Sequence, residues 1–411
     1  MGGHAELEAF YRHLRSDDVE RDALLVPHLA RSRARAAEQK VVLAVADSTS
    51  YTFSGDADRE GLGPVNKADQ GFLAHVTLFV SADGTRLPLG IADVQAWTRS
   101  GRRSSVGKES ARWLSGMRRV SKATSASVIH VADRESDIYP LMASMVREGE
   151  RFVLRAAQDR RVLIAEDDLT LLFRAARSCP TLLEREVPLS ARKHKASTKD
   201  RKAFPARRQR IAKLVFGAIA VELMRPRRAK KKDLQGTTKV NVVHVLEPNP
   251  PEGEPPVEWL LLTTEPVDTP EQIAFIVDCY RARWTIEEYF KATKTGCAFE
   301  SKQLESFRTI SNLYAYVLVV AYALILMRAL SRSARDEPAT IILSEDELTV
   351  LRAKRPKLPK NPAVREALLA VASLGGHLRN NGDPGWQTLS KGWAVLLALA
   401  EGYRLARGLE K

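Results

Sequence analysis

Two short apolar runs, VVLAVAD at 41–47 and SVIHVAD at 127–133, constrain the fold of this chain more than any other feature. Both are rich in β-branched residues and lack alternation with polar residues, which is typical of strands buried on both faces of a sheet. Each run ends in an aspartate, Asp47 or Asp133. We therefore expect two core strands of an α/β sheet, each with a carboxylate at its C-terminal end, where ligands bind in mostly parallel sheets.

The segments around these runs complete a mixed α/β pattern. The apolar stretches 71–80 and 85–97 are joined by the turn sequence ADG and predict a hairpin. The segment SDIYPLMASMVREG predicts a helix that ends at Gly149, and RFVLRA at 151–156 predicts another strand. The order of strand, hairpin, strand, helix and strand indicates a mixed α/β sheet.

A helix that carries charged residues follows the strand expected at 257–267. Thr269, Pro270 and Gln272 form a capping-box pattern at its start. The helix leads into YRARWTIEEYFKATKTG at 280–296. At about 100° per residue, five polar side chains share one narrow sector of this helix: Tyr280, Arg283, Glu287, Lys291 and Lys294. A solvated face with Glu-to-Lys pairs is the ordinary explanation, and a reactive face is the alternative.

The charge of the chain points to a polyanionic partner. The 411 residues carry a net charge of +14, with 44% hydrophobic residues, which is a globular composition. The segment 190–233 contains sixteen Lys and Arg against Asp200, Glu222 and Asp233, or 16 − 3 = +13. This basic run suits phosphate binding, either as a DNA-binding surface or as a solvated loop that binds nucleic acid without specificity.

Other features exclude several classes of protein. The three cysteines and eight histidines show no metal-ligand spacing, so we expect neither a zinc site nor a disulfide framework. The apolar stretch 309–327 contains polar and tyrosine residues and has charges close on both sides, so we expect a buried core helix and no membrane contact.

Three carboxylates thus stand at informative places: Asp47, Asp133 and Glu287. Clustered carboxylates repel one another unless a divalent cation neutralises them. Two Mg²⁺ ions about 4 Å apart would activate a water or a 3′-hydroxyl for cleavage of a phosphodiester. For Asp133 the alternative is a helix cap, because a possible helix start follows at Arg134.

The spacing Tyr280-x2-Arg283-x3-Glu287-x6-Lys294 resembles the YREK signature of the DDE transposases of the insertion-sequence-four group, the cut-and-paste kind typified by the transposon-five enzyme. The spacing alone is a weak signal, but further blocks occur in the same order. These are LAVADSTS at 43–50, HVADRESDIY at 130–139, RFVLR at 151–155, EWLLLTTEPV at 258–267 and SLGGHLRNNGDPGWQTL at 373–389.

The resemblance implies a fold and a set of site residues. Asp47, Asp133 and Glu287 would bind Mg²⁺, or Mn²⁺, as two ions. The resemblance implies that contacts with DNA phosphates are made by Tyr280, Arg283, Lys291 and Lys294. It implies that Arg155 and Trp259 contact a flipped nucleotide. It also implies that Trp284 lies near the DNA. From the residues alone, a core position for either tryptophan and an exposed strand position for Arg155 stay open.

The resemblance also divides the chain into five regions around an RNase H-like core that is interrupted by a mainly β lobe. We expect a helical remnant of a DNA-binding domain at 1–38, the first part of the core at 39–160, the basic β-rich lobe at 161–255, the second part of the core with the YREK helix at 256–335, and a C-terminal helical dimerisation region at 336–411.

The implied activity is that of a cut-and-paste transposase. It would hydrolyse double-stranded DNA at transposon ends, through a hairpin intermediate, and transfer the freed strand into target DNA. The enzyme would be a homodimer in the DNA complex and would act in the cytoplasm, at the nucleoid. Only forty-six residues precede Asp47, fewer than in relatives, so a truncated, non-catalytic or inhibitory DNA-binding remnant is the alternative. A nuclease without end specificity is a third.

Overall fold

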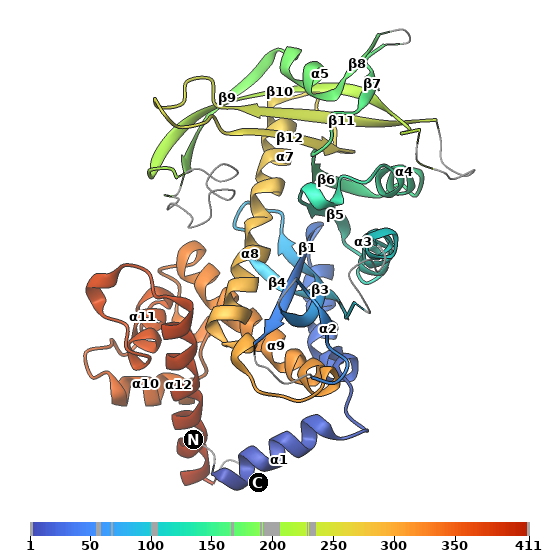
Figure 1. Cartoon of the computed structure of the whole chain (residues 1–411). Coiled ribbons are helices and arrows are strands. Elements are labelled where there is room, and N and C mark those ends of the chain that lie inside the picture. The colour runs from blue at the N-terminus through green and yellow to red at the C-terminus, as the bar shows by residue number, and fades with distance from the viewer. Residues whose placement is uncertain are drawn as a thin grey trace. The chain divides into compact units, whose positions relative to one another are not determined.

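The computed structural model (Figure 1) describes residues 3–54, 59–66, 69–99, 106–165, 168–189, 191, 206–227, 229 and 236–408. The chain forms two units. Unit 1 contains residues 1–106, 122–127 and 284–411, and unit 2 contains residues 107–121 and 128–283. Both units combine helices with strands, so the mixed α/β class expected from the sequence is confirmed.

The sheet of unit 1 is an antiparallel meander. It consists of β1 (Val41–Phe53), β3 (Gln70–Ser81) and β4 (Pro88–Trp97), with the short β2 (Gly63–Pro64) beside the start of β3. The strand β3 pairs with β1 along one edge and with β4 along the other. The hairpin predicted at 71–97 is therefore present.

The strand β1 is longer than the sequence predicts. It continues six residues beyond Asp47, which pairs with Val76 of β3 in the middle of the ladder. The extension alternates, with Tyr51 and Phe53 buried and the intervening Thr52 half-buried, because a strand with one covered face needs apolar residues only at every second position. The expectation of a strand-end carboxylate in a parallel sheet is thus wrong for Asp47.

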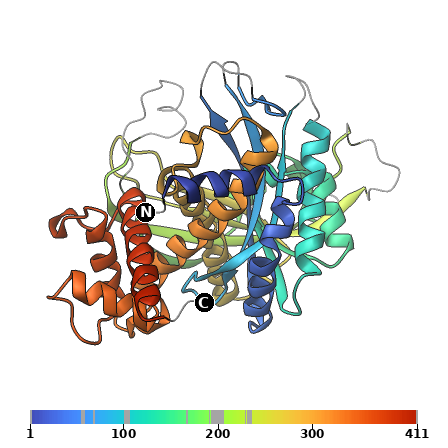
Figure 2. The ribbon, with the colours of Figure 1, turned by 90° about the horizontal axis from the view of Figure 1, so that it is seen from below.

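The helices of unit 1 come from both ends of the chain. They are α1 (His4–Arg15), α2 (Arg21–Ala37), α8 (Trp284–Lys291), the π-helical turn η2 (Ala292–Gly296), η3 (Phe299–Ser301), α9 (Phe307–Ser333), η4 (Ala339–Ile341), α10 (Glu345–Lys354), α11 (Val364–Leu374), η5 (Arg379–Asn381) and α12 (Trp386–Ala406). The helices α2 and α9 pack on β4, and α10, α11 and α12 form one group, which Figure 2 shows from below.

The helix α9 is the central helix of unit 1. By length and composition it is apolar enough to cross a membrane, and 50% of its most apolar window is buried inside the protein. Its buried residues contact α2, α8, α11 and β4, so the core helix expected at 309–327 is present. Tyr314 of this helix stacks on Phe299 and contacts Tyr51 and Phe72 edge-on, which forms the aromatic core of the unit.

The sheet of unit 2 has the strand order β5-β6-β12-β11-β10-β7-β8, with β9 paired to β10. Its strands are β5 (Ser127–Ala132), β6 (Arg151–Arg155), β7 (Arg161–Leu163), β8 (Leu169–Leu171), β9 (Thr181–Leu189), β10 (Arg210–Met224), β11 (Thr237–Leu246) and β12 (Glu258–Thr263). The pair β5 and β6 is parallel, and the registers of the other pairs are antiparallel. The segment expected to be a mainly β lobe thus continues the β6–β12 sheet through β11.

In the part of unit 2 that the structure describes, four helices and one turn accompany this sheet. They are α3 (Val106–Ser121), η1 (Arg134–Ser136), α4 (Tyr139–Arg147), α5 (Leu172–Ser178) and α7 (Pro270–Ala282). The helix α7 lies across β9, β10 and β11 (Figure 1). The sequence analysis treated the segment of α3 as a connection, whereas Trp113, Met117 and Val120 form a buried face at helical spacing.

Candidate functional site

The residues expected to form the site are divided between the two units. Unit 1 contains Asp47, Trp284, Glu287, Lys291 and Lys294. Unit 2 contains Asp133, Arg155, Trp259, Tyr280 and Arg283. The boundary between the units falls within the signature, between Arg283 and Trp284.

The signature segment is not one regular α-helix. The helix α7 ends at Ala282, α8 covers Trp284–Lys291, and η2 is a π-helical turn in which Cys297 N donates a hydrogen bond to Ala292 O at 2.8 Å. Tyr280 is only 5% exposed. The alternative of a solvated face therefore does not hold for Tyr280, and the constant 100° per residue assumed for the segment does not extend through the π-helical turn.

Contacts with β1 hold the π-helical turn in place. The hydroxyl of Thr293 lies 2.8 Å from the hydroxyl of Tyr51 and donates to Phe290 O at 2.9 Å. The ammonium of Lys294 donates to Ser50 O at 2.7 Å and lies 5.3 Å from the centre of the Tyr51 ring. Burial lowers the pKa of Lys294 and the nearby Glu300 opposes that shift. One of the three N–H donors of Lys294 is thus committed to the strand, and two stay available for a ligand.

This anchoring brings Glu287 to the level of Asp47. In Figure 1, α8 and β1 lie side by side and run in the same direction. Ser50 lies three residues after Asp47, which is about 10 Å along a strand. Lys294 lies seven residues after Glu287, also about 10 Å along a helix. Because Lys294 contacts Ser50, we expect the backbones at Glu287 and Asp47 to lie at about the same level in unit 1.

These two carboxylates suit a hard divalent cation such as Mg²⁺, which prefers oxygen ligands. Asp47 uses one oxygen to accept a hydrogen bond from Ser48 N at 2.8 Å. Among the residues that the structure describes, no group of three or more His, Cys, Asp or Glu side chains is placed to hold a metal ion. Unit 1 contains two of the three predicted carboxylates, Asp47 and Glu287.

Asp133 lies directly after β5, as the sequence predicts. Its carboxylate accepts a hydrogen bond from Glu135 N at 2.9 Å and caps the turn η1. The cap that the sequence analysis left as an alternative is thus present. It uses one carboxylate oxygen, and the other oxygen keeps its capacity to accept.

Next to Asp133, unit 2 collects arginine and aromatic side chains. Arg155 pairs with Leu261 across β6 and β12, so it shares a sheet face with Trp259, two residues along β12. The Trp259 ring contacts the Tyr280 ring edge-on at 5.6 Å. The guanidinium of Arg283 lies 6.0 Å from the centre of the Tyr280 ring.

Two residues that the sequence reasoning passed over complete this group. Burial and the charge of Arg155 lower the pKa of the Arg134 guanidinium, whereas Tyr280 and Asp133 act in the opposite direction. Asp137 is buried and joins the turn η1 to the loop after β6. The stretch RESD after Asp133 was the available signal, because polar residues directly after a buried strand lie at the ligand-binding edge of a sheet. We call Arg134, Arg155, Trp259, Tyr280 and Arg283 the arginine cluster.

Two further predicted residues lie on the surface of α8. Trp284 is 52% exposed, so the alternative that it packs in the core is wrong. The ammonium of Lys291 lies 4.8 Å from the centre of the Trp284 ring, a cation–π contact. Together they present an exposed cation and an exposed aromatic face.

Ten of the sixteen cations of the basic run at 190–233 lie outside the described residues. Of its described members, Arg210 forms ion pairs with Glu247 and Glu254, and Lys213 pairs with Glu184 at 2.5 Å. Carboxylates of the same unit thus neutralise these two cations.

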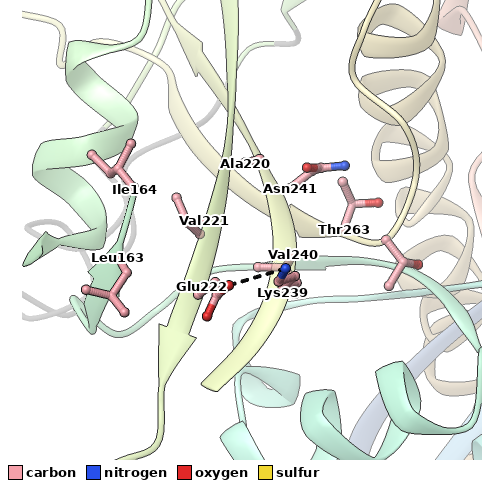
Figure 3. Close-up of a pocket in the computed structure, with 10 residues that line it drawn as sticks. Leu163, Ile164, Ala220, Val221, Glu222, Lys239, Val240, Asn241 and Thr263 are labelled. Carbon is pink, nitrogen blue, oxygen red and sulfur yellow. Dashed lines mark ion pairs between the residues drawn. The ribbon is translucent and has the colours of Figure 1, made fainter. Parts of the chain in front are cut away.

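A pocket of about 390 Å³ opens on the sheet of unit 2 among β7, β10, β11 and β12 (Figure 3). Glu222 and Lys239 at its edge form an ion pair at 3.5 Å. None of the ten residues predicted from the sequence lines it. The pocket is therefore separate from the candidate site.

Comparison with known families bears on the same residues. Residues 127–324 match the family model described as "Transposase DDE domain". The matched segment contains Asp133, Glu287 and the whole signature from Tyr280 to Lys294, and it begins after Asp47. The match supports a DDE transposase.

One solved structure with a weak likeness is the piggyBac transposase synaptic complex with hairpin DNA, determined by cryo-EM. The identity is 10% and the TM-score 0.34, over 72% of this chain and 48% of that chain. This chain thus covers about half the length of that protein. At this identity and TM-score the likeness does not determine the fold or activity of this chain, which are inferred from its own residues.

Proposed function

We propose that the chain is a cut-and-paste DNA transposase of the insertion-sequence-four group, with an RNase H-like core. It hydrolyses a phosphodiester at each transposon end, passes through a DNA hairpin and joins the 3′-hydroxyl to target DNA. The observation that carries the proposal is the family match, which includes the signature and two of the three carboxylates. The contact of α8 with β1 in unit 1, where Lys294 binds Ser50 O, supports it.

In this proposal Asp47, Asp133 and Glu287 hold two Mg²⁺ ions, or Mn²⁺. When bound, such ions make a water or a 3′-hydroxyl nucleophilic and stabilise the leaving oxygen. The protein contributes by holding the carboxylates on a strand, a capped turn and a helix, because rigid elements fix ligand geometry better than loops do. Asp133 is oriented by its bond from Glu135 N, and Asp47 by its bond from Ser48 N.

The remaining site residues bind DNA. Arg283, Lys291 and Lys294 contact phosphates, Arg283 by a two-pronged guanidinium and the lysines as point charges. Tyr280 contacts a phosphate through its hydroxyl, the one polar group of its side chain. Arg155 and Trp259 hold a nucleotide flipped out of the duplex, for which an indole is a suitable stacking surface. Trp284 lies against the DNA beside Lys291.

Two transposon ends must be cut together, so we propose a homodimer in the DNA complex, with the C-terminal group α10, α11 and α12 as the dimer contact. The protein acts in the cytoplasm on nucleoid DNA and not at a membrane.

A cleavage assay with two matched variants tests the proposal. Glu287→Gln removes a carboxylate of the triad and should abolish Mg²⁺-dependent cleavage of an end-containing duplex while DNA binding persists. Glu288→Gln makes the same change one residue later, where the carboxylate pairs with Arg332 at 3.4 Å, and should keep most of the activity.

Three outcomes decide between the alternatives. Cleavage that survives Glu287→Gln contradicts the role of Glu287. A wild-type chain that binds the ends but never cuts them is a non-catalytic or inhibitory remnant. Cutting that does not depend on the end sequence indicates a general nuclease.

A further inference from the structure

We propose that Arg134 and Arg155 form a clamp for a single phosphate of the nucleic-acid backbone, so that Arg134 is a DNA-binding residue in its own right. The proposal deepens the function proposed above and rests on it. All the residues that carry it belong to unit 2.

The fold brings the two arginines to one edge of the sheet. The strands β5 and β6 are parallel neighbours, and Ala132 is in register with Leu154. Residues just after these positions leave the sheet at the same end, as the carboxyl ends of parallel strands do. Arg155 is the residue after Leu154, and Arg134 lies two residues after Ala132 in the turn η1.

A buried carboxylate holds the two segments together. Asp137, 1% exposed, accepts hydrogen bonds from Ala157 N at 2.7 Å and Gln158 N at 2.8 Å. The guanidinium of Arg160 binds the other oxygen of Asp137 at 2.6 Å and the main-chain oxygen of Asp137 at 2.6 Å. The turn that carries Arg134 is thereby fixed to the loop that follows Arg155. We call this set of contacts the Asp137 staple.

The charges of the two guanidiniums are only partly offset within the unit, by Asp133 acting on Arg134. The guanidinium of Arg155 donates to the main-chain oxygen of Glu258 at 3.3 Å. Among the described residues, neither Arg134 nor Arg155 forms an ion pair with a carboxylate. Two like charges held close together repel each other unless an anion lies between them. A phosphate is the anion that two guanidinium forks fit best.

The neighbouring aromatic residues indicate which phosphate carrier fits. Trp259 shares a sheet face with Arg155, and its ring contacts Tyr280. An aromatic ring beside a phosphate site suits a nucleic acid, because a base next to the bound phosphate can stack on the ring. A free phosphate would gain nothing from Trp259.

Binding of a short fluorescein-labelled DNA duplex, measured by anisotropy in EDTA at several salt concentrations, tests the clamp without requiring cleavage. Arg134→Gln and Arg155→Gln should each weaken binding about tenfold, the loss expected for one charge-assisted contact. Arg174→Gln is the matched control, because Arg174 is an exposed arginine of α5 outside the cluster and its loss changes the net charge equally. It should weaken binding by less than about threefold.

The salt dependence shows whether one phosphate is shared. With a clamp, either single variant leaves the phosphate neutralised and the slope of log K against log salt nearly unchanged, and the double variant lowers the slope by about 0.9. The clamp is overturned if each single variant lowers the slope by about 0.9. It is also overturned if Arg134→Gln weakens DNA binding no more than Arg174→Gln does. A wild-type protein that does not bind DNA at all contradicts the proposed function itself.

Discussion

The Asp137 staple is the feature of unit 2 whose loss has the most definite consequence. In Asp137→Asn the side-chain oxygen can still accept from Ala157 N and Gln158 N, but the new NH₂ group then faces the Arg160 guanidinium donors. Arg160 is only 7% exposed, so its charge is left buried without a counter-charge. The shape of the site is kept, and only charge and hydrogen bonding change.

The size of the stability loss in Asp137→Asn follows from these contacts. Removing one partner of a buried ion pair destabilises a protein by about 3–5 kcal/mol. Hydrogen bonds to a charged acceptor contribute about 1.5–3 kcal/mol each, but they share one carboxylate here and do not add. We expect Asp137→Asn to lower the free energy of unfolding by about 3–5 kcal/mol.

Urea denaturation followed by circular dichroism measures this loss, and hydrogen exchange at the amides of Ala157 and Gln158 locates it. Asp159→Asn is the control, because Asp159 is an exposed carboxylate of the same loop that accepts from Phe173 N at 2.8 Å. It should cost about 1 kcal/mol or less. The reasoning is refuted if Asp137→Asn stays within about 0.5 kcal/mol of wild type and both amides keep their protection.

Two further predictions concern unit 1. Burial and two nearby arginines lower the pKa of His28 from 6.5 to about 4, and its ring accepts from Ile91 N. As pH falls, the unfolded chain therefore takes up a proton on His28 before the folded chain does. The contribution of neutral His28 to the free energy of unfolding is complete above about pH 6.5 and is lost toward pH 4. This loss is at most roughly 3 kcal/mol, and about half of that after solvent screening. Urea titrations across this range should show the slope in wild type and not in His28→Gln; equal slopes would contradict the assignment. Gly392→Ala would place its Cβ 2.0 Å from Val371 O where α11 and α12 meet, and should lower stability by about 1–3 kcal/mol in thermal melts. Gly402→Ala on the same helix has open space and should not destabilise; a harmless Gly392→Ala would mean that the two helices separate freely.

Local sequence patterns predicted the local structure well. Thr269 and Gln272 form the expected capping box, with the Thr269 hydroxyl accepting from Gln272 N. Gly149 has a φ of +72° after α4 and ends that helix as expected. These features depend on residues within one turn of each other, so their spacing along the chain is sufficient information.

Features that depend on distant partners were not predictable in the same way. The π-helical turn at Ala292–Gly296 is held by Ser50 and Tyr51, more than 240 residues earlier in the chain. The function of Asp137 becomes visible only when the loop after β6 lies beside it. For Asp47, the end of the apolar run suggested the end of a strand, whereas pairing with β3 extends the strand beyond it.

The division of the signature between the two units has a consequence for the order of events at the DNA. Unit 2 holds the arginine cluster, which needs no metal to attract a phosphate, together with Asp133. Unit 1 holds Asp47 and Glu287, which attract a divalent cation, together with Lys291 and Lys294. DNA affinity measured in EDTA should therefore depend on Arg134 and Arg155. The metal concentration that is required for cleavage should depend on Glu287. If the two half-sites act in this way, Arg134→Gln weakens DNA binding at any Mg²⁺ concentration and leaves the Mg²⁺ dependence of the cleavage rate unchanged at saturating DNA. A shift in the Mg²⁺ requirement by Arg134→Gln would instead show that cation binding and phosphate binding are a single event.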